Sequence, residues 1–142
     1  MSIRATANFD VTGWDETPYD EPTDGPRLAR ATVRKTFRGD LEGESTADLL
    51  MCQADPDDFL AGAGYVASEQ VVGSLDGRSG TFVLQHGGVS GGNTEPRTFG
   101  HIVPGSGTDA LAGLYGTAEL SRTADGKHTL TLDYDFLDTP AS

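Results

Sequence analysis

The stretch HTLTLDYDF, residues 128–136, alternates apolar and polar side chains along most of its length. Its apolar positions are Leu130, Leu132, Tyr134 and Phe136, with threonine or aspartate between them. A β-strand points successive side chains to opposite faces, so this period of two predicts a strand with one apolar face.

Working outward, the same period recurs in seven further segments, separated by turns such as Asp76-Gly77 and Asp125-Gly126. The acidic, proline-containing residues 15–26 and the glycine-rich residues 87–93 are expected to be loops. Many strands with almost no helical pattern predict an all-β fold. We expect a single eight-stranded antiparallel β-barrel over residues 1–142, with at most one short helical turn near residues 108–113. The expected strands cover residues 3–14, 27–37, 41–53, 59–74, 79–86, 97–103, 115–122 and 128–136.

Composition narrows the classes of partner. The chain has 142 residues, 36% of them hydrophobic, which is enough for one domain with a single core. Its formal net charge of −12 repels phosphate groups, so we expect neither nucleic acid nor an anionic membrane as a partner. A lone Cys52 and the absence of a signal-like or membrane-spanning apolar run predict a cytoplasmic protein.

Six short stretches form a combined pattern: WDETPY (14–19), SEQVVG (68–73), GTFVLQH (80–86), VPGSGT (103–108), LAGL (111–114) and LDY (132–134). Together they resemble a bacterial family of uncharacterised proteins, the domain of unknown function 3224 family. The resemblance implies an eight-stranded antiparallel barrel similar to that of allene oxide cyclase and the plant dirigent proteins. It implies no activity, because the catalytic residues of the cyclase have no match in this sequence.

Strand parity predicts which polar side chains point inward. We take the more apolar parity of each strand to face the lumen; residues 59–74 are less decisive, and there the larger, odd-numbered set is chosen. Tyr65, Glu69, His86 and Tyr134 then share the lumen. A carboxylate and an imidazole in an apolar cavity form a general base and acid pair, so Glu69 and His86 are the candidate catalytic residues. Burial would raise the pKa of the glutamate and lower that of the histidine, towards neutrality.

Structural alternatives stand beside this reading. Glu69 could pair with Lys35 or with an arginine at the rim, His86 could bond to backbone at a strand end, and the two tyrosines could be wall residues. Trp14 is expected to pack at the barrel mouth within a lid-like loop, and with the four luminal residues it completes the ligand-binding candidates. Neither the acidic loop nor the three histidines have metal-ligand spacing, so we expect no metal and no cofactor.

Three functions fit this reading, and the sequence does not decide whether the protein is an enzyme. The favoured one is binding of a small hydrophobic or amphipathic molecule in the lumen, because a binding cavity requires fewer precisely placed side chains than an active site. The second is a cofactor-free isomerase or cyclase using Glu69, His86 and Tyr134. The third is a homo-oligomeric scaffold with Val66, Val72 and Val83 at the subunit interface. The first predicts a cavity lined by small inward residues: Ala5, Ala7, Ala29, Ala31, Gly43, Ala47 and Ala67.

Overall fold

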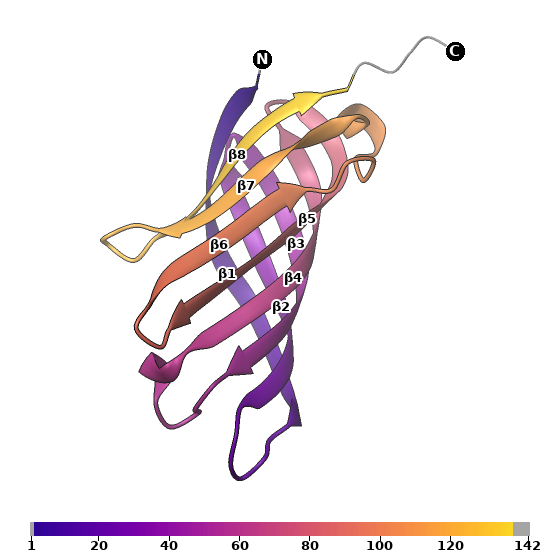
Figure 1. Cartoon of the computed structure of the whole chain (residues 1–142). Helices are drawn as coiled ribbons and strands as arrows, with labels where there is room; N and C mark the ends of the chain where they lie inside the picture. Colours follow the sequence, from indigo (N-terminus) through magenta and orange to yellow (C-terminus); the bar gives the residue numbers. More distant parts are fainter. Residues whose placement is uncertain (1, 138–142) are drawn as a thin grey trace.

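The computed structural model describes residues 2–137 and shows eight antiparallel strands, each hydrogen-bonded to the next (Figure 1). The last strand pairs with the first, so the predicted eight-stranded barrel is confirmed. Two predicted strands, 41–53 and 128–136, match the observed bounds at both ends. The strands are β1 (Ile3–Asp20), β2 (Arg27–Gly39), β3 (Leu41–Gln53), β4 (Ala63–Leu75), β5 (Arg78–Gly91), β6 (Thr94–Ile102), β7 (Leu114–Arg122) and β8 (His128–Phe136).

Two 3-10 turns interrupt the strand order. The turn η2 (Asp109–Leu111) lies where a helical turn was predicted. The turn η1 (Phe59–Ala61) occupies residues that were predicted to begin the fourth strand. The Asp58 side chain accepts a hydrogen bond from the backbone N–H of Leu60 and so caps this turn, which delays β4 until Ala63. Neither turn approaches the length and apolar character that a helix needs to cross a lipid bilayer.

The acidic segment 15–26 is shorter as a loop than predicted, because β1 continues to Asp20. Its pairing with β2 runs on through two register shifts, next to Val11 and next to Pro18. Pairing of β1 with β8 ends at the Phe9–His128 pair, so beyond Phe9 the strand is an edge. A proline such as Pro18 is tolerated on an edge, where a missing N–H need not break a ladder on both sides.

The glycine-rich segment 87–93 was also predicted to be a loop, but β5 extends through it to Gly91. Gly87 shows why. A Cβ atom built on it would lie 2.6 Å from the Phe99 ring on β6. The missing side chain therefore lets an aromatic ring cover the sheet, and the glycine serves close packing rather than a turn.

The two ends of the barrel are built differently. At the closed end, which we define as the part where all eight strands are hydrogen-bonded, apolar side chains fill the interior. At the open end, β6 and β7 separate, because they pair only through residues 101–102 and 116–117. There β1 also runs past β8, because their pairing ends at Phe9 and His128. The buried cluster of the closed end consists of Ala5, Ala7, Phe9, Phe37, Leu41, Val71, Leu75, Phe82, Leu84, Ile102, Leu111, Leu114, Ala118, Leu130, Leu132 and Tyr134.

Candidate functional site

Four buried polar side chains lie on four neighbouring strands between the two ends. They are Lys35 on β2, Ser45 on β3, Glu69 on β4 and His86 on β5, and Glu69 has no exposed surface. Each occupies the inward parity of its strand, in a row of otherwise apolar or small residues. The odd parity of β4 therefore faces inward, as the sequence predicted.

These side chains form one hydrogen-bonded network around the Glu69 carboxylate. Lys35 Nζ lies 3.0 Å from Glu69 Oε1, and His86 Nε2 lies 2.8 Å from the same oxygen. Ser45 Oγ donates to Oε2 at 2.6 Å. Tyr65 Oη lies 3.0 Å from the other ring nitrogen of the histidine, Nδ1. We call these five residues the Glu69 network, and Tyr65 is its half-buried member.

The charge state of Glu69 is set by its partners. Burial raises the pKa of its carboxyl group, but the hydrogen bond from His86, the charge of Lys35 and the hydrogen bond from Ser45 outweigh it and lower the pKa to about 2. The sequence predicted the opposite direction because it considered burial alone. A carboxylate that binds protons so weakly, with both oxygens engaged, is unsuited to act as a general base at neutral pH.

Tyr134, which was grouped with these residues, lies elsewhere. It points inward at the closed end and donates to the Asp76 carboxylate in the β4–β5 turn. Burial and this hydrogen bond raise its pKa to about 12. Asp76 lies seven residues beyond Glu69, which corresponds to roughly 20 Å along a strand. The structure therefore does not bring Glu69, His86 and Tyr134 together, and the three-residue catalytic set is wrong as a unit.

Trp14 lies on β1 rather than in a lid-like loop. Its register partner on β2 is the buried Val33, which places it on the inner side of the open end, where it is 50% exposed. Its indole N–H donates to Glu16 Oε1 at 3.1 Å, and Glu16 pairs with Arg27 at 2.6 Å. These contacts hold the ring at the edge of the sheet.

Sequence reasoning missed part of the network. Lys35 was considered only as one partner for Glu69, and Ser45 was not considered at all. The available signal was a break in parity. Lys35 interrupts the inward series of the second strand between Val33 and Phe37, so a buried cation there requires a buried anion.

Within residues 2–137 the inward alanines are buried and do not line a shared cavity, although Ala67 borders a pocket of about 300 Å³ on the outer face. Ala31 and Ala47 have no exposed surface, and the other inward alanines are also buried. The partly buried Leu49 and Met51 pack over Ala31, Val33 and Ala47 and fill this space. The accessible inner surface of the open end is therefore made by larger side chains.

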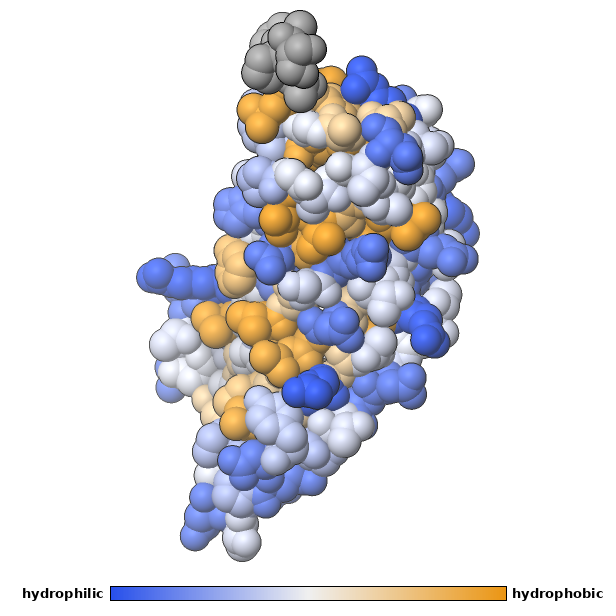
Figure 2. All heavy atoms as spheres, turned by 90° about the vertical axis from the view of Figure 1, so that its right-hand side faces the viewer, coloured by the Kyte–Doolittle hydropathy of each residue, from blue (hydrophilic) through white to orange (hydrophobic). Residues whose placement is uncertain are grey.

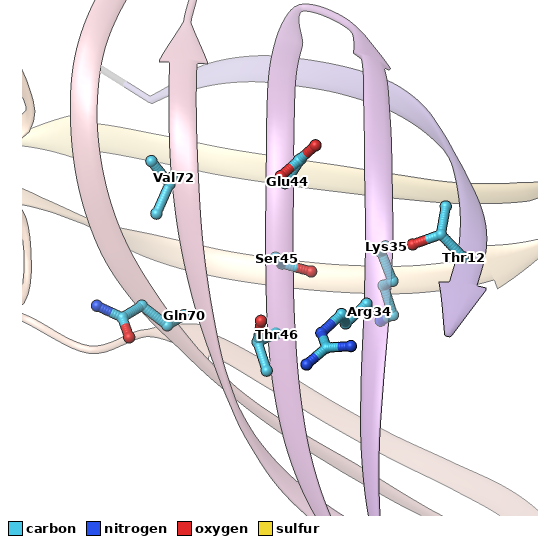
Figure 3. A pocket seen from close by; sticks show the side chains of 8 residues that line it. All are labelled: Thr12, Arg34, Lys35, Glu44, Ser45, Thr46, Gln70 and Val72. Atoms are coloured by element: carbon cyan, nitrogen blue, oxygen red, sulfur yellow. The ribbon is translucent and has the colours of Figure 1, made fainter. Parts of the chain in front are cut away.

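A pocket of about 480 Å³ lies on the outer face of β1 to β4 (Figure 3). Two members of the Glu69 network, Lys35 and Ser45, also line it, although both are buried and bonded to Glu69 inside the barrel. The pocket thus borders the network without exposing it. Its other lining residues are exposed: Thr12, Arg34, Glu44, Thr46, Gln70 and Val72.

Apolar side chains also gather on the outer surface, as Figure 2 shows for one side of the molecule. Leu50, Val66 and Phe99 are about half exposed and fall in one cross-strand row, with Gly87 between the last two. Val72 is exposed as predicted, whereas Val83 is partly buried. Association of copies through this surface stays a prediction.

No group of three His, Cys, Asp or Glu side chains within residues 2–137 is placed to hold a metal ion. The fold and the site together define a class of protein. It is a small all-β protein whose ring of eight antiparallel strands encloses an apolar core and a buried charged network.

The chain belongs to the DUF3224 family, described as proteins of unknown function, whose model matches residues 5–134. This confirms the resemblance seen in the sequence. A solved structure of a DUF3224 protein from Shewanella oneidensis MR-1, described as having unknown function, is similar to this chain. The two are 38% identical with a TM-score of 0.80, over 96% of this chain and 99% of that one. No curated protein sequence matches the chain.

Proposed function

We propose that this protein binds a small amphipathic molecule at the open end of the barrel. The observation that carries this proposal is the position of Tyr65, the half-buried end of an otherwise buried network. In this arrangement the polar group of the ligand contacts Tyr65. Its apolar part lies along the partly exposed inward side chains Leu49, Met51 and Trp14.

The energetics of the network support a role beyond stability. Burying an ammonium and a carboxylate costs desolvation energy that their attraction only partly returns, and apolar residues of similar volume are often at least as stabilising. Perturbed ionisable groups held in fixed geometry are typical of functional sites. Charge limits the ligand as well, because a protein with a net charge of −12 repels a strongly anionic molecule.

Native mass spectrometry of freshly purified protein tests this proposal. We expect a copurifying small molecule whose occupancy falls in Tyr65→Phe and is unchanged in Tyr115→Phe, a matched change on a strand far from the network. A compound retained equally by both variants contradicts the proposed site. If no compound copurifies, titration with medium-chain alcohols decides, and no binding to the full chain would refute the proposal.

One observation favours a second function, a cofactor-free isomerase. Glu69, His86 and Tyr65 are aligned as carboxylate, imidazole and hydroxyl, the order of groups in a proton relay. In such a relay Tyr65 accepts a proton from the ligand while its own proton moves to His86 Nδ1, and the same path returns a proton to another atom of the ligand. Deuterium uptake from solvent into the bound compound, lost in His86→Phe, is the expected result. Equal uptake in both proteins excludes the relay.

A further inference from the structure

We infer that the ligand presents a hydrogen-bond donor, a hydroxyl or an N–H group, to Tyr65, because the Glu69 network leaves the tyrosine oxygen with acceptor capacity alone. This inference rests on the proposed function and specifies the ligand of the same site. It follows from the direction of each hydrogen bond in the network.

The direction is fixed first at Glu69. The ammonium of Lys35 can only donate, and it lies 3.0 Å from Glu69 Oε1 in an ion pair with no exposed surface on the carboxylate. An ionised carboxylate can only accept. Ser45 therefore donates its hydroxyl proton to Oε2, and His86 must donate to Oε1.

The direction is then transmitted through the imidazole. Because Nε2 of His86 donates to the carboxylate, a neutral ring carries its proton on Nε2 and has a bare Nδ1. A bare ring nitrogen accepts. Tyr65 Oη, 3.0 Å away, consequently donates its only proton to Nδ1.

At Tyr65 the chain of donors ends. The phenol oxygen has given its proton inward and keeps only lone pairs for any further partner. A ligand hydroxyl or N–H can donate to these lone pairs. An ether or carbonyl oxygen has no proton to donate, so it forms no hydrogen bond with the tyrosine oxygen. Leaving the oxygen of the half-buried Tyr65 without a partner costs free energy, and this cost discriminates between ligands that differ by one donor.

The test must distinguish the contribution of Tyr65 from that of a neighbouring hydroxyl group. Thr98 lies in the same cross-strand row as Tyr65, through Gly88, and its hydroxyl can serve as donor or acceptor. A preference that depends on Tyr65 must disappear when the tyrosine hydroxyl is removed, whatever Thr98 contributes.

The experiment compares two isomers of equal composition, 1-octanol and 1-methoxyheptane, titrated into the full chain at neutral pH by calorimetry or NMR. We expect octanol to bind about tenfold more tightly, the equivalent of one good hydrogen bond. In Tyr65→Phe the ratio should fall below about twofold, while Tyr115→Phe should keep it. Equal or tighter binding of the ether to the unmodified protein overturns the inference.

A second measurement tests the hydrogen-bond direction without a ligand and without a variant. Nitrogen NMR of the imidazole of His86 should show the proton on Nε2 and a bare Nδ1. A proton on Nδ1, in the other tautomer or in the imidazolium, would reverse the bond to Tyr65 and overturn the inference. If neither isomer binds, the proposed function fails, and this spectrum still judges the hydrogen-bond direction by itself.

Discussion

The closed end and the centre of this barrel fill the same kind of space in different ways. The closed end is packed with apolar side chains, such as Phe82 and Leu84, with no exposed surface. Directly opposite Leu84 on the neighbouring strand, β4 introduces Glu69, and the interior becomes a charged network. The difference teaches that this chain can fill its barrel without charge, so the Glu69 network is a local feature placed where the ring opens.

The sharpest test of the closed end is Phe82→Ala. We expect a loss of about 4 kcal/mol in the free energy of unfolding, because a large buried ring leaves a cavity. The matched control is Phe99→Ala on the outer face, where the ring is half exposed and the loss should be about 1 kcal/mol. Urea unfolding followed by circular dichroism measures both. Equal losses would mean that the closed end is not the stabilising core.

In the Glu69 network, the loss of stability should depend on whether both members of the Lys35–Glu69 ion pair are removed or only one. Glu69→Leu leaves Lys35 buried without its carboxylate, and we expect a loss of about 3 to 4 kcal/mol. Adding Lys35→Met to this variant should recover most of the loss, because no unpaired charge remains. Glu44→Gln, an exposed change on β3, should have almost no effect. Losses that simply add in the double variant would contradict the pair.

Acid titration separates the two regions without mutation. The folded pKa of Glu69, about 2, lies below the ordinary value of 4.5, so its contribution is complete above pH 4.5 and is lost as the pH falls towards 2. The difference corresponds to about 3 kcal/mol. The Glu69→Leu, Lys35→Met double variant should lack this component in the same range. Identical pH profiles of the two proteins would show that Glu69 does not control acid stability.

The smallest expected effect concerns Tyr65, where the network meets the surface. Tyr65→Phe removes one hydrogen bond to His86 and should lower the free energy of unfolding by about 1 kcal/mol. Its effect on binding of 1-octanol should be larger than its effect on stability. Thermal unfolding with and without the alcohol measures both quantities, and a variant that keeps full ligand stabilisation would contradict the site.

The period of two along each strand was sufficient to predict the ring of eight strands. On β4 the period was less decisive, and the larger side chains of the odd-numbered set indicated the inward face. Together these signals brought Tyr65, Glu69 and His86 to one side correctly. Parity gives the face of a residue but not its height in the barrel, which depends on how the strands are staggered. For that reason Tyr134 was placed with Glu69 although it lies at the closed end.

Other differences came from contacts between distant segments. The glycines after His86 were predicted to form a loop, because the sequence does not show that Phe99 packs over Gly87. The alanines were predicted to line a cavity, because the sequence does not show that Leu49 and Met51 pack over Ala31 and Ala47. The pKa of Glu69 depends on the number of hydrogen-bond donors around it, and the spacing of residues in the sequence does not give that number.

The part of β1 beyond Phe9, which pairs with β2 alone, has a consequence for how the protein behaves at high concentration. Beyond Phe9 this strand offers backbone N–H and C=O groups that another chain could extend into a shared sheet. Pro18 carries no N–H donor, and Asp15 and Asp20 add negative charge that an identical edge repels. These features of the open edge oppose its pairing with the same edge of a second copy.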